Sequence, residues 1–269
     1  ELKYSLDGGL DNYPYLIATG IANTGKYPAD GSGWTIPNNI SKQCKIRVES
    51  LDHPADNPDV AGVSANNFTI RGGLNITQPI SSDVWSVGQT KTIIWDVIGS
   101  VGDVTLQYID TDSLWYDIAT VDCATPTTYS RNWVVADAIS ATAKVRIRPV
   151  LDRADIAESQ PFKIRGFISV TKPDTLGEIL RVGDIYTIKW AISGTINTVK
   201  LEWSINGDAG PWNYIDTVGA GLTGGEYNWP VSNTISGNVK IRVSDSTIPE
   251  SNGVSPQVLI KGKLRLDEP

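Results

Sequence analysis

The sequence predicts an all-β fold in which antiparallel β-sandwiches follow one another along the chain. Three observations support this prediction. The 269-residue sequence repeats its own motifs, its apolar residues alternate with polar ones along short segments, and its 25 glycines and 15 prolines separate those segments. Alternation with a period of two is typical of half-buried strands, and glycine and proline mark the turns between strands.

Internal repeats are the strongest of these signals. Pro79, Pro173 and Pro269 end similar short segments and lie 94 and 96 residues apart. Further motifs recur at matching distances, namely Lys45-Ile46-Arg47-Val48 with Lys144-Val145-Arg146-Ile147 and Lys240-Ile241-Arg242-Val243, Trp34 with Trp133 and Trp229, and Phe68–Gly72 with Phe162–Gly166 and Val258–Gly262. We therefore expect the C-terminal part of one repeat in 1–72, complete repeats in 73–166 and 167–262, and the first strand of a further repeat in 263–269. On this division we expect the natural protein to continue in both directions.

Alternating residues predict the strands within a repeat. Ile93, Trp95 and Val97 share one face of a segment, and Val104 and Leu106 share one face of the next. One apolar and one polar face is the pattern of an antiparallel strand that covers a core on one side. In the second repeat we expect about seven strands, near 73–77, 90–97, 103–109, 115–121, 128–135, 143–149 and 160–165. This strand count and unit length predict an immunoglobulin-like (Ig-like) or fibronectin-III-like sandwich.

The turns and junctions agree with that fold. Asp7-Gly8 and Asn206-Gly207 fall between the same two strands of two repeats, and such pairs favour hairpins because both residues tolerate positive φ. Only one or two residues separate the last strand of one repeat, at Ile164-Arg165, from the first strand of the next, at Phe167-Ile168. A linker this short cannot behave as a random coil, so we expect a semi-rigid row of domains.

Composition excludes some partners. The net charge of −7 and the pI of about 4.8 disfavour nucleic-acid binding, because such a chain repels phosphate. No apolar run is long enough to cross a bilayer, so this segment is not expected to insert into membranes. The two cysteines lie at non-equivalent repeat positions and are not expected to form a disulfide. We expect Cys44 to be a buried thiol and Cys123 a loop thiol.

The sequence lacks the residues that catalysis needs. Its one histidine, His53, lies in a loop and has no counterpart in the other repeats, so we interpret it as a solvated residue. Phosphate-binding glycine loops and metalloprotease motifs are absent. Carboxylates are numerous enough for a glycosidase pair, but no unique insertion singles one out. We predict a non-enzymatic protein.

Calcium is the cofactor that the sequence leaves open, since hard cations take several carboxylate oxygens. The loop before the last strand of each repeat is acidic. Its residues are Asp52, Asp56 and Asp59 in the first, Asp152, Asp155 and Glu158 in the second, and Asp245 and Glu250 in the third. The favoured alternative is a solvated charged loop that discourages edge-to-edge aggregation.

Tryptophans carry the remaining site predictions. Trp95, Trp133, Trp190 and Trp229 recur at strand positions and are expected in the cores. Trp115 and Trp212 stand beside a hairpin turn and could bind glycans by stacking on sugar rings, although packing over the sheet end is favoured. The Lys and Arg of the Lys-x-Arg motif are expected to face outward, where pairing with carboxylates is favoured over binding of an anionic wall polymer. N-glycosylation sequons begin at Asn39, Asn67 and Asn75, which is no more than chance predicts.

The motifs from Val87-Gly88 and Ile93-Ile94-Trp95 to Lys144–Ile147 and Phe162–Ile164 resemble the Ig-like repeats of large bacterial cell-surface proteins. They are also similar to the extracellular domain of the yeast Ser/Thr-rich, GPI-anchored cell-wall glucan-synthesis family. Among bacterial proteins of this build, S-layer proteins fit best, including the S-layer glycoprotein of anammox planctomycetes. The resemblance implies a fold far more specifically than a function.

Three functions follow from these observations. The first is a structural cell-surface protein, an S-layer lattice or stalk component, secreted to the cell surface or cell wall and self-associating into an array. The second is a carbohydrate-binding or adhesive module for cell-wall or surface glycans. The third is an accessory repeat region of a large secreted enzyme. The repeats, short junctions and acidity favour the first.

Overall fold

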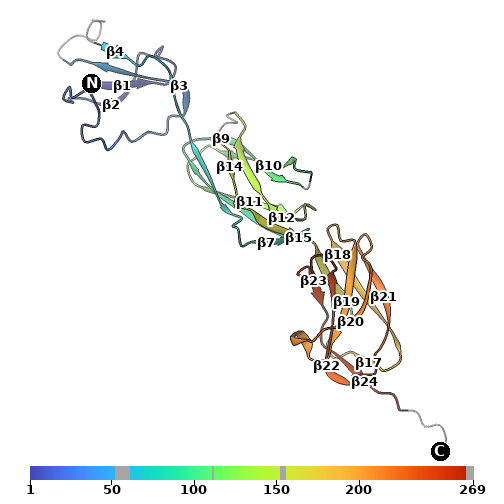
Figure 1. Cartoon of the computed structure of the whole chain (residues 1–269). Coiled ribbons are helices and arrows are strands. Elements are labelled where there is room, and N and C mark those ends of the chain that lie inside the picture. The colour runs from blue at the N-terminus through green and yellow to red at the C-terminus, as the bar shows by residue number, and fades with distance from the viewer. Residues whose placement is uncertain (52–60, 111, 152–155, 265–269) are drawn as a thin grey trace, which may run out of the picture.

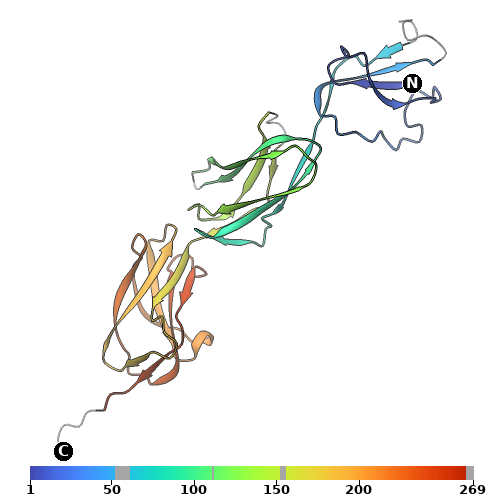
Figure 2. The same cartoon turned by 180° about the vertical axis from the view of Figure 1, so that it is seen from behind.

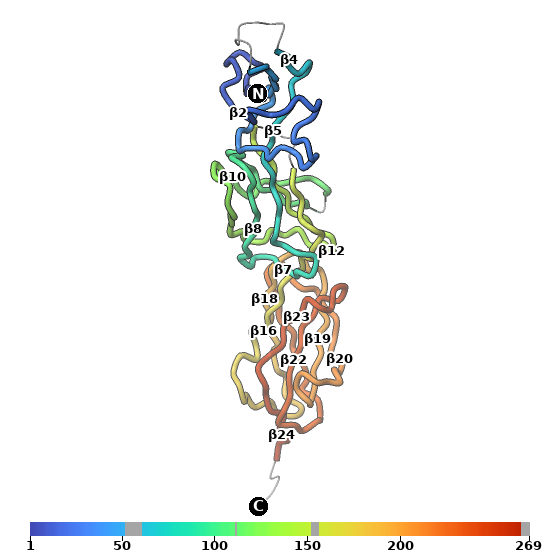
Figure 3. Tube along the Cα trace, turned by 90° about the vertical axis from the view of Figure 1, so that its left-hand side faces the viewer, coloured from blue at the N-terminus to red at the C-terminus, as the bar shows by residue number. Residues whose placement is uncertain are grey.

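The chain forms three successive β units in an elongated row (Figures 1, 2 and 3). The computed structural model describes residues 1–51, 61–110, 112–151 and 156–264. All strand pairs formed by these residues lie within 1–72, 73–166 or 167–262, hereafter the first, second and third units.

The second unit is a sandwich of two sheets. One sheet has the order β11-β8-β6, and the facing sheet has the order β10-β9-β13-β14. Lys144 separates β13 from β12, and on the β12 side the facing sheet is continued by β12-β15-β7, in which β7 pairs with β15 in parallel. The strands are β6 (Gly73–Gln78), β7 (Val84–Ser86), β8 (Thr90–Ile98), β9 (Gly102–Ile109), β10 (Trp115–Cys123), β11 (Thr128–Val134), β12 (Ser140–Ala143), β13 (Val145–Pro149), β14 (Ala157–Glu158) and β15 (Phe162–Arg165).

The third unit repeats this arrangement. Its sheets have the orders β16-β18-β21 and β17-β24-β22-β19-β20, with β23 paired to β22. The strands are β16 (Phe167–Lys172), β17 (Ile179–Arg181), β18 (Ile185–Ser193), β19 (Thr198–Ser204), β20 (Asn213–Gly219), β21 (Gly224–Pro230), β22 (Ser236–Asp245), β23 (Asn252–Val254) and β24 (Val258–Lys261). The all-β, tandem Ig-like fold is therefore confirmed for both complete units.

The seven strands expected in the second unit are all present, but three short strands, β7, β12 and β14, were not expected. β7 and β14 are only three and two residues long, too short to show alternation. The Asn206-Gly207 turn has the expected positive φ at Gly207, 62°. It is not a two-residue hairpin, because the 3-10 turn Gly207–Ala209 lengthens the loop between β19 and β20.

Alternating apolar residues fill the space between the sheets. The four recurring tryptophans, Trp95, Trp133, Trp190 and Trp229, are all buried, as expected. Trp95 is fully enclosed with the aliphatic residues of β8, β9 and β13. In the third unit Trp190 donates its indole N–H to the carbonyl oxygen of Ala220 at 3.0 Å.

Both cysteines are free and buried. Cys44 faces the core of the first unit, as predicted. The prediction that Cys123 is a loop thiol is wrong, because it ends β10 and packs into the core of the second unit. Burial raises the pKa of the Cys123 thiol and so favours its protonated form.

The first unit has a single sheet, of order β2-β1-β3-β4 with β5 paired to β3. Its strands are β1 (Leu2–Ser5), β2 (Tyr15–Ala18), β3 (Ser41–Glu49), β4 (Ala61–Val63) and β5 (Phe68–Ile70). No strand among its described residues corresponds to β6 or β8. Leu2 and Val48 instead line an open cavity of about 860 Å³. Val48 is 49% exposed, whereas its equivalents Ile147 and Val243 are fully buried.

Because the sheet face at Val48 of the first unit is uncovered, a valine-to-alanine substitution should lower stability less there than at the equivalent position of the third unit. Val243→Ala should destabilise the third unit by about 2–3 kcal/mol, because it removes buried methyl groups and leaves a cavity. Val48→Ala should cost less than about 1 kcal/mol, because that side chain is already half in water. Urea titration followed by NMR signals specific to each unit measures both values, and equal losses would contradict the difference in packing.

Candidate functional site

The junctions between units are the most strongly repeated feature outside the cores. Two residues, Arg71 and Gly72, separate β5 from β6, and the single residue Gly166 separates β15 from β16. These linkers are as short as the sequence predicts. With so few free torsions, the neighbouring units must contact each other directly.

The linker glycines lie against an apolar side chain of the following unit. A Cβ atom on Gly72 would lie 2.5 Å from Cγ2 of Val101, and one on Gly166 would lie 2.7 Å from Cδ1 of Ile196. Both distances are far shorter than a carbon–carbon contact allows. Glycine is therefore needed at the linker because the next unit approaches so closely. We call Val101 and Ile196 the wedge residues.

A polar side chain of the preceding unit holds the turn that carries the wedge. Oδ1 of Asn38 accepts a hydrogen bond from the Ser100 backbone N–H at 2.7 Å, and Nδ2 of Asn38 donates to Ser100 Oγ at 2.9 Å. At the second junction, Oδ1 of Asp137 accepts from the Thr195 N–H at 3.0 Å, and Oδ2 accepts from the Thr195 hydroxyl at 2.6 Å. We call Asn38 and Asp137 the clamp residues.

Residues at equivalent repeat positions build both junctions, although the sequence pattern alone did not predict them. The clamps lie in equivalent eight-residue segments, Trp34-Thr35-Ile36-Pro37-Asn38-Asn39-Ile40-Ser41 and Trp133-Val134-Val135-Ala136-Asp137-Ala138-Ile139-Ser140. The wedges are the last residues of equivalent turn segments, Gly99-Ser100-Val101 and Gly194-Thr195-Ile196. Extending the alignment beyond the tryptophans would have revealed both patterns, but only the structure shows that they touch.

The second junction has further contacts. Nη1 of Arg165 donates to the carbonyl oxygen of Glu250 at 2.7 Å, which links β15 to the loop before β23. A Cβ atom on Gly194 would lie 3.0 Å from Cγ2 of Val87, so the turn of the third unit also abuts the second unit near β7. Contacts on several sides of the linker restrict bending in more than one direction.

The Lys-x-Arg motifs lie on the outer sheet face, as expected. The guanidinium groups of Arg146 and Arg242 lie over the rings of Trp115 and Trp212, 4.1 and 4.2 Å from the ring centres. This cation–π arrangement covers one face of each ring. Trp115 and Trp212 are partly exposed, and glycan binding by them stays a prediction.

Glycan binding by these tryptophans predicts that the unaltered protein binds a glycan on an array and that Trp212→Ala abolishes this binding. An array on which the unaltered protein binds no glycan would contradict the prediction.

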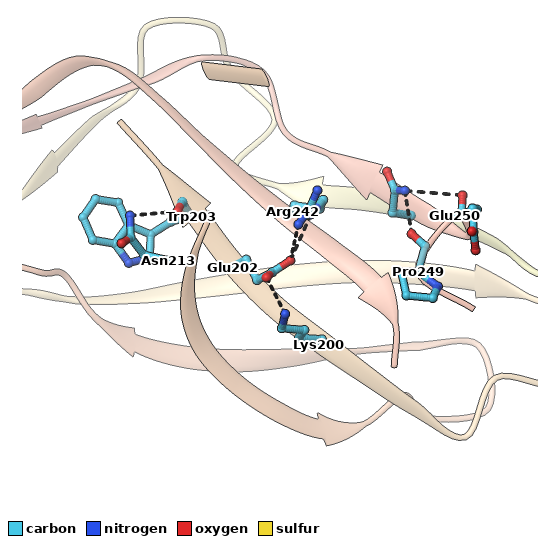
Figure 4. A network of polar contacts seen from close by, with 8 residues as sticks. Lys200, Glu202, Trp203, Asn213, Arg242, Pro249 and Glu250 are labelled. Carbon is cyan, nitrogen blue, oxygen red and sulfur yellow. Dashed lines mark hydrogen bonds and ion pairs between the residues drawn. The ribbon is translucent and has the colours of Figure 1, made fainter. Parts of the chain in front are cut away.

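Figure 4 shows the charged part of this face in the third unit. Glu202 is almost fully buried and pairs with Arg242 at 2.5 Å and with Lys200 at 2.6 Å. Burial alone would raise the pKa of Glu202, but hydrogen bonds from Lys200 and Arg242 and their charges outweigh it and lower that pKa. The equivalent residue of the second unit is the neutral Gln107, which accepts from Nε of Arg146 at 2.7 Å.

Most residues of the proposed calcium site lie outside the described residues. These are Asp52, Asp56, Asp59, Asp152 and Asp155, and His53 lies outside them too. Glu158 is described and pairs with Lys144 at 3.1 Å. Asp245 ends β22 and accepts hydrogen bonds from Thr247 and Ile248 in the turn that follows. Within the described ranges no three His, Cys, Asp or Glu side chains are grouped so that they could hold a metal ion.

Comparisons with known proteins are limited to solved structures, since no family model and no curated protein matches the chain. The chain is similar to fibronectin(III)-like modules of Clostridium thermocellum CbhA, with 14% identity and a TM-score of 0.27, over 73% of this chain and 100% of that chain. It is similar to a tetra-tandem repeat in the extending region of a large adhesion protein, with 13% identity and a TM-score of 0.30, over 78% of this chain and 55% of that chain. A third match, DIP-gamma IG1+IG2, has 7% identity and a TM-score of 0.25, over 72% and 99% of the two chains.

Identities and TM-scores this low support no statement about function, and the S-layer and yeast-family resemblances gain no support from them. The part of the chain that the structure describes also contains no helix with the length and hydropathy of a membrane span.

The environment of Glu202 predicts a pH dependence specific to the third unit. Because folding lowers the pKa of Glu202 below its ordinary value of 4.5, its contribution to stability is present above that pH and is lost as the pH falls through the folded value. Glu202→Gln should therefore flatten the acid side of the stability profile of the third unit. Urea titrations across a pH series, read from NMR signals of each unit, measure this slope.

Glu226→Gln is the matched control, since the Glu226–Lys189 pair lies in the same unit but is largely exposed. If the stability of the third unit falls as steeply with decreasing pH in Glu202→Gln as in Glu226→Gln, the result would contradict the attribution of this pH dependence to Glu202.

Proposed function

We propose that this chain is part of a non-catalytic structural protein of the cell surface, in which Ig-like units form a semi-rigid rod within an S-layer lattice or a stalk. The observation that carries the proposal is the repeated junction. At both junctions one linker glycine, one apolar wedge and one side-chain clamp take equivalent positions in the repeat. A flexible string of domains would not require the same three elements twice.

The free energies of the junction contacts fit a junction that restricts bending without preventing it. Ordering a linker residue costs about 1–2 kcal/mol of backbone entropy. A neutral hydrogen bond contributes about 0.5–1.5 kcal/mol, and one to a charged group about 1.5–3 kcal/mol. Two hydrogen bonds at each clamp, together with a wedge that is buried at Ile196 and partly buried at Val101, are enough to offset the ordering of a linker of one or two residues.

The remaining features are compatible with such a rod. The net charge of −7 favours solubility and suits a surface exposed to cations. The outer faces of the sheets carry Arg–Trp stacks and paired charges. A carbohydrate-binding module is the second candidate, and its supporting observation is the partial exposure of Trp115 and Trp212 on that face.

Distance measurements across the second junction test the rod. Spin labels are placed at the equivalent exposed positions 130 and 226 in a chain carrying Cys44→Ala and Cys123→Ala, alanine being the residue at or near the equivalent positions. The unaltered junction should give a narrow distance distribution by pulsed electron paramagnetic resonance. In Asp137→Ala the distance distribution should be about twofold broader, because both hydrogen bonds to Thr195 are lost. Neighbouring domains without a tight interface move independently of each other.

Asp174→Ala is the control, since Asp174 is an exposed residue that accepts a hydrogen bond from the hydroxyl of its neighbour Thr175. Circular dichroism melts should show that both units still fold. A broad distribution in the unaltered chain, or an unchanged one in Asp137→Ala, would contradict a clamped rod.

Electron microscopy tests the assignment to a surface array. The purified protein, with and without added calcium, should form ordered assemblies if it is a lattice component. Particles that stay monomeric under every cation condition would contradict self-association.

Melting the protein with and without chelator tests calcium binding. A melting temperature that chelator leaves unchanged would contradict it.

A further inference from the structure

The third unit carries a second set of junction residues at the end that faces away from the second unit. The segment Trp229-Pro230-Val231-Ser232-Asn233-Thr234-Ile235-Ser236 is equivalent to the two clamp segments, and it places Asn233 at the clamp position. Gly262, just after β24, is equivalent to the linker glycines Gly72 and Gly166. Figure 1 shows β24 and β22 at this end of the molecule, the distal pole.

The distal pole already has the geometry of a half-junction. At the first junction, Cδ1 of Ile40 lies 3.2 Å from the position that a Cβ atom on Gly72 would take. In the third unit, Cδ1 of Ile235, equivalent to Ile40, lies 3.5 Å from the corresponding position on Gly262. The contact between isoleucine and linker glycine is therefore formed before any partner is present.

The groups that would meet a partner at this pole are open. Ile235 is 69% exposed, whereas its equivalents at the occupied junctions are less so, with Ile40 41% exposed and Ile139 partly buried. Asn233 is exposed, and among the described residues its side chain has no hydrogen-bond partner. At the occupied junctions the same position bonds both the backbone N–H and the hydroxyl of the turn.

We propose that the distal pole is a docking surface for another Ig-like unit, one whose turn reads Gly-Ser/Thr-Val/Ile. The partner follows from the chemistry of the two occupied junctions. Asn233 would accept from the backbone N–H of the Ser or Thr, and the Val or Ile would pack on Gly262, where only a glycine leaves room. The inference rests on the proposed rod function and extends it from the two observed junctions to the exposed surface around Asn233 and Ile235.

The neutral clamp has a consequence for how docking responds to salt. Asn38 and Asn233 carry no charge, unlike Asp137. Screening weakens interactions between charges and leaves apolar packing and neutral hydrogen bonds largely unaffected. Docking at the distal pole should therefore persist at high ionic strength.

An extended chain provides the test, made of residues 1–263 followed by a second copy of 168–262. The copy supplies a Gly194-Thr195-Ile196 turn to the distal pole. Spin labels at position 226 and at the same position of the copy should give a distance distribution as narrow as the pair at 130 and 226. Asn233→Ala and Gly262→Val should each broaden it about twofold, towards independent domain motion.

Leu176→Ser is the matched control, because Leu176 is an exposed apolar residue in the loop between β16 and β17 and has no part in the half-junction. It should leave the distribution unchanged, and melts of each variant should show intact units. A broad distribution at the added junction beside a narrow one at 130 and 226 would overturn this inference alone. Broad distributions at both would overturn the proposed rod as well.

Discussion

Close backbone approach at the linker is the constraint on which the arrangement of the units depends. Val101 and Ile196 occupy the space that any side chain at Gly72 or Gly166 would need. This contact brings the next unit near enough for Asn38 and Asp137 to reach the turn that carries the wedge. Contact and hydrogen bonds thus depend on each other, because a bulkier linker residue would separate the units and break the clamp.

Within each complete unit, buried tryptophans and aliphatic residues close the sandwich, while the outer face is held by arginines stacked on aromatic rings. Arg242 joins the ring of Trp212 to the buried carboxylate of Glu202, and Arg146 joins Trp115 to Gln107. The first unit shows what the second sheet contributes. Without strands like β6 and β8 among its described residues, Val48 stays half exposed.

Periodicity made most of the fold predictable, because alternation and recurring tryptophans depend only on local sequence. The edge strand β7 could not be predicted, since three residues show no period and its partner β15 is distant in sequence. Cys123 was misplaced because β10 runs two residues further than the alternation indicated. The linker length was predictable, but the clamp was not. Asn38 and Ser100 are 62 residues apart, and no local pattern connects them.

Residual dipolar couplings of the whole chain test the central claim most directly, because they report the orientation of each unit relative to a common frame. If the junction fixes the second unit against the third, couplings from 73–166 and 167–262 should fit one alignment tensor of a single magnitude. Two tensors of different magnitude would show that the units reorient independently, and that the glycine, wedge and clamp do not hold them together.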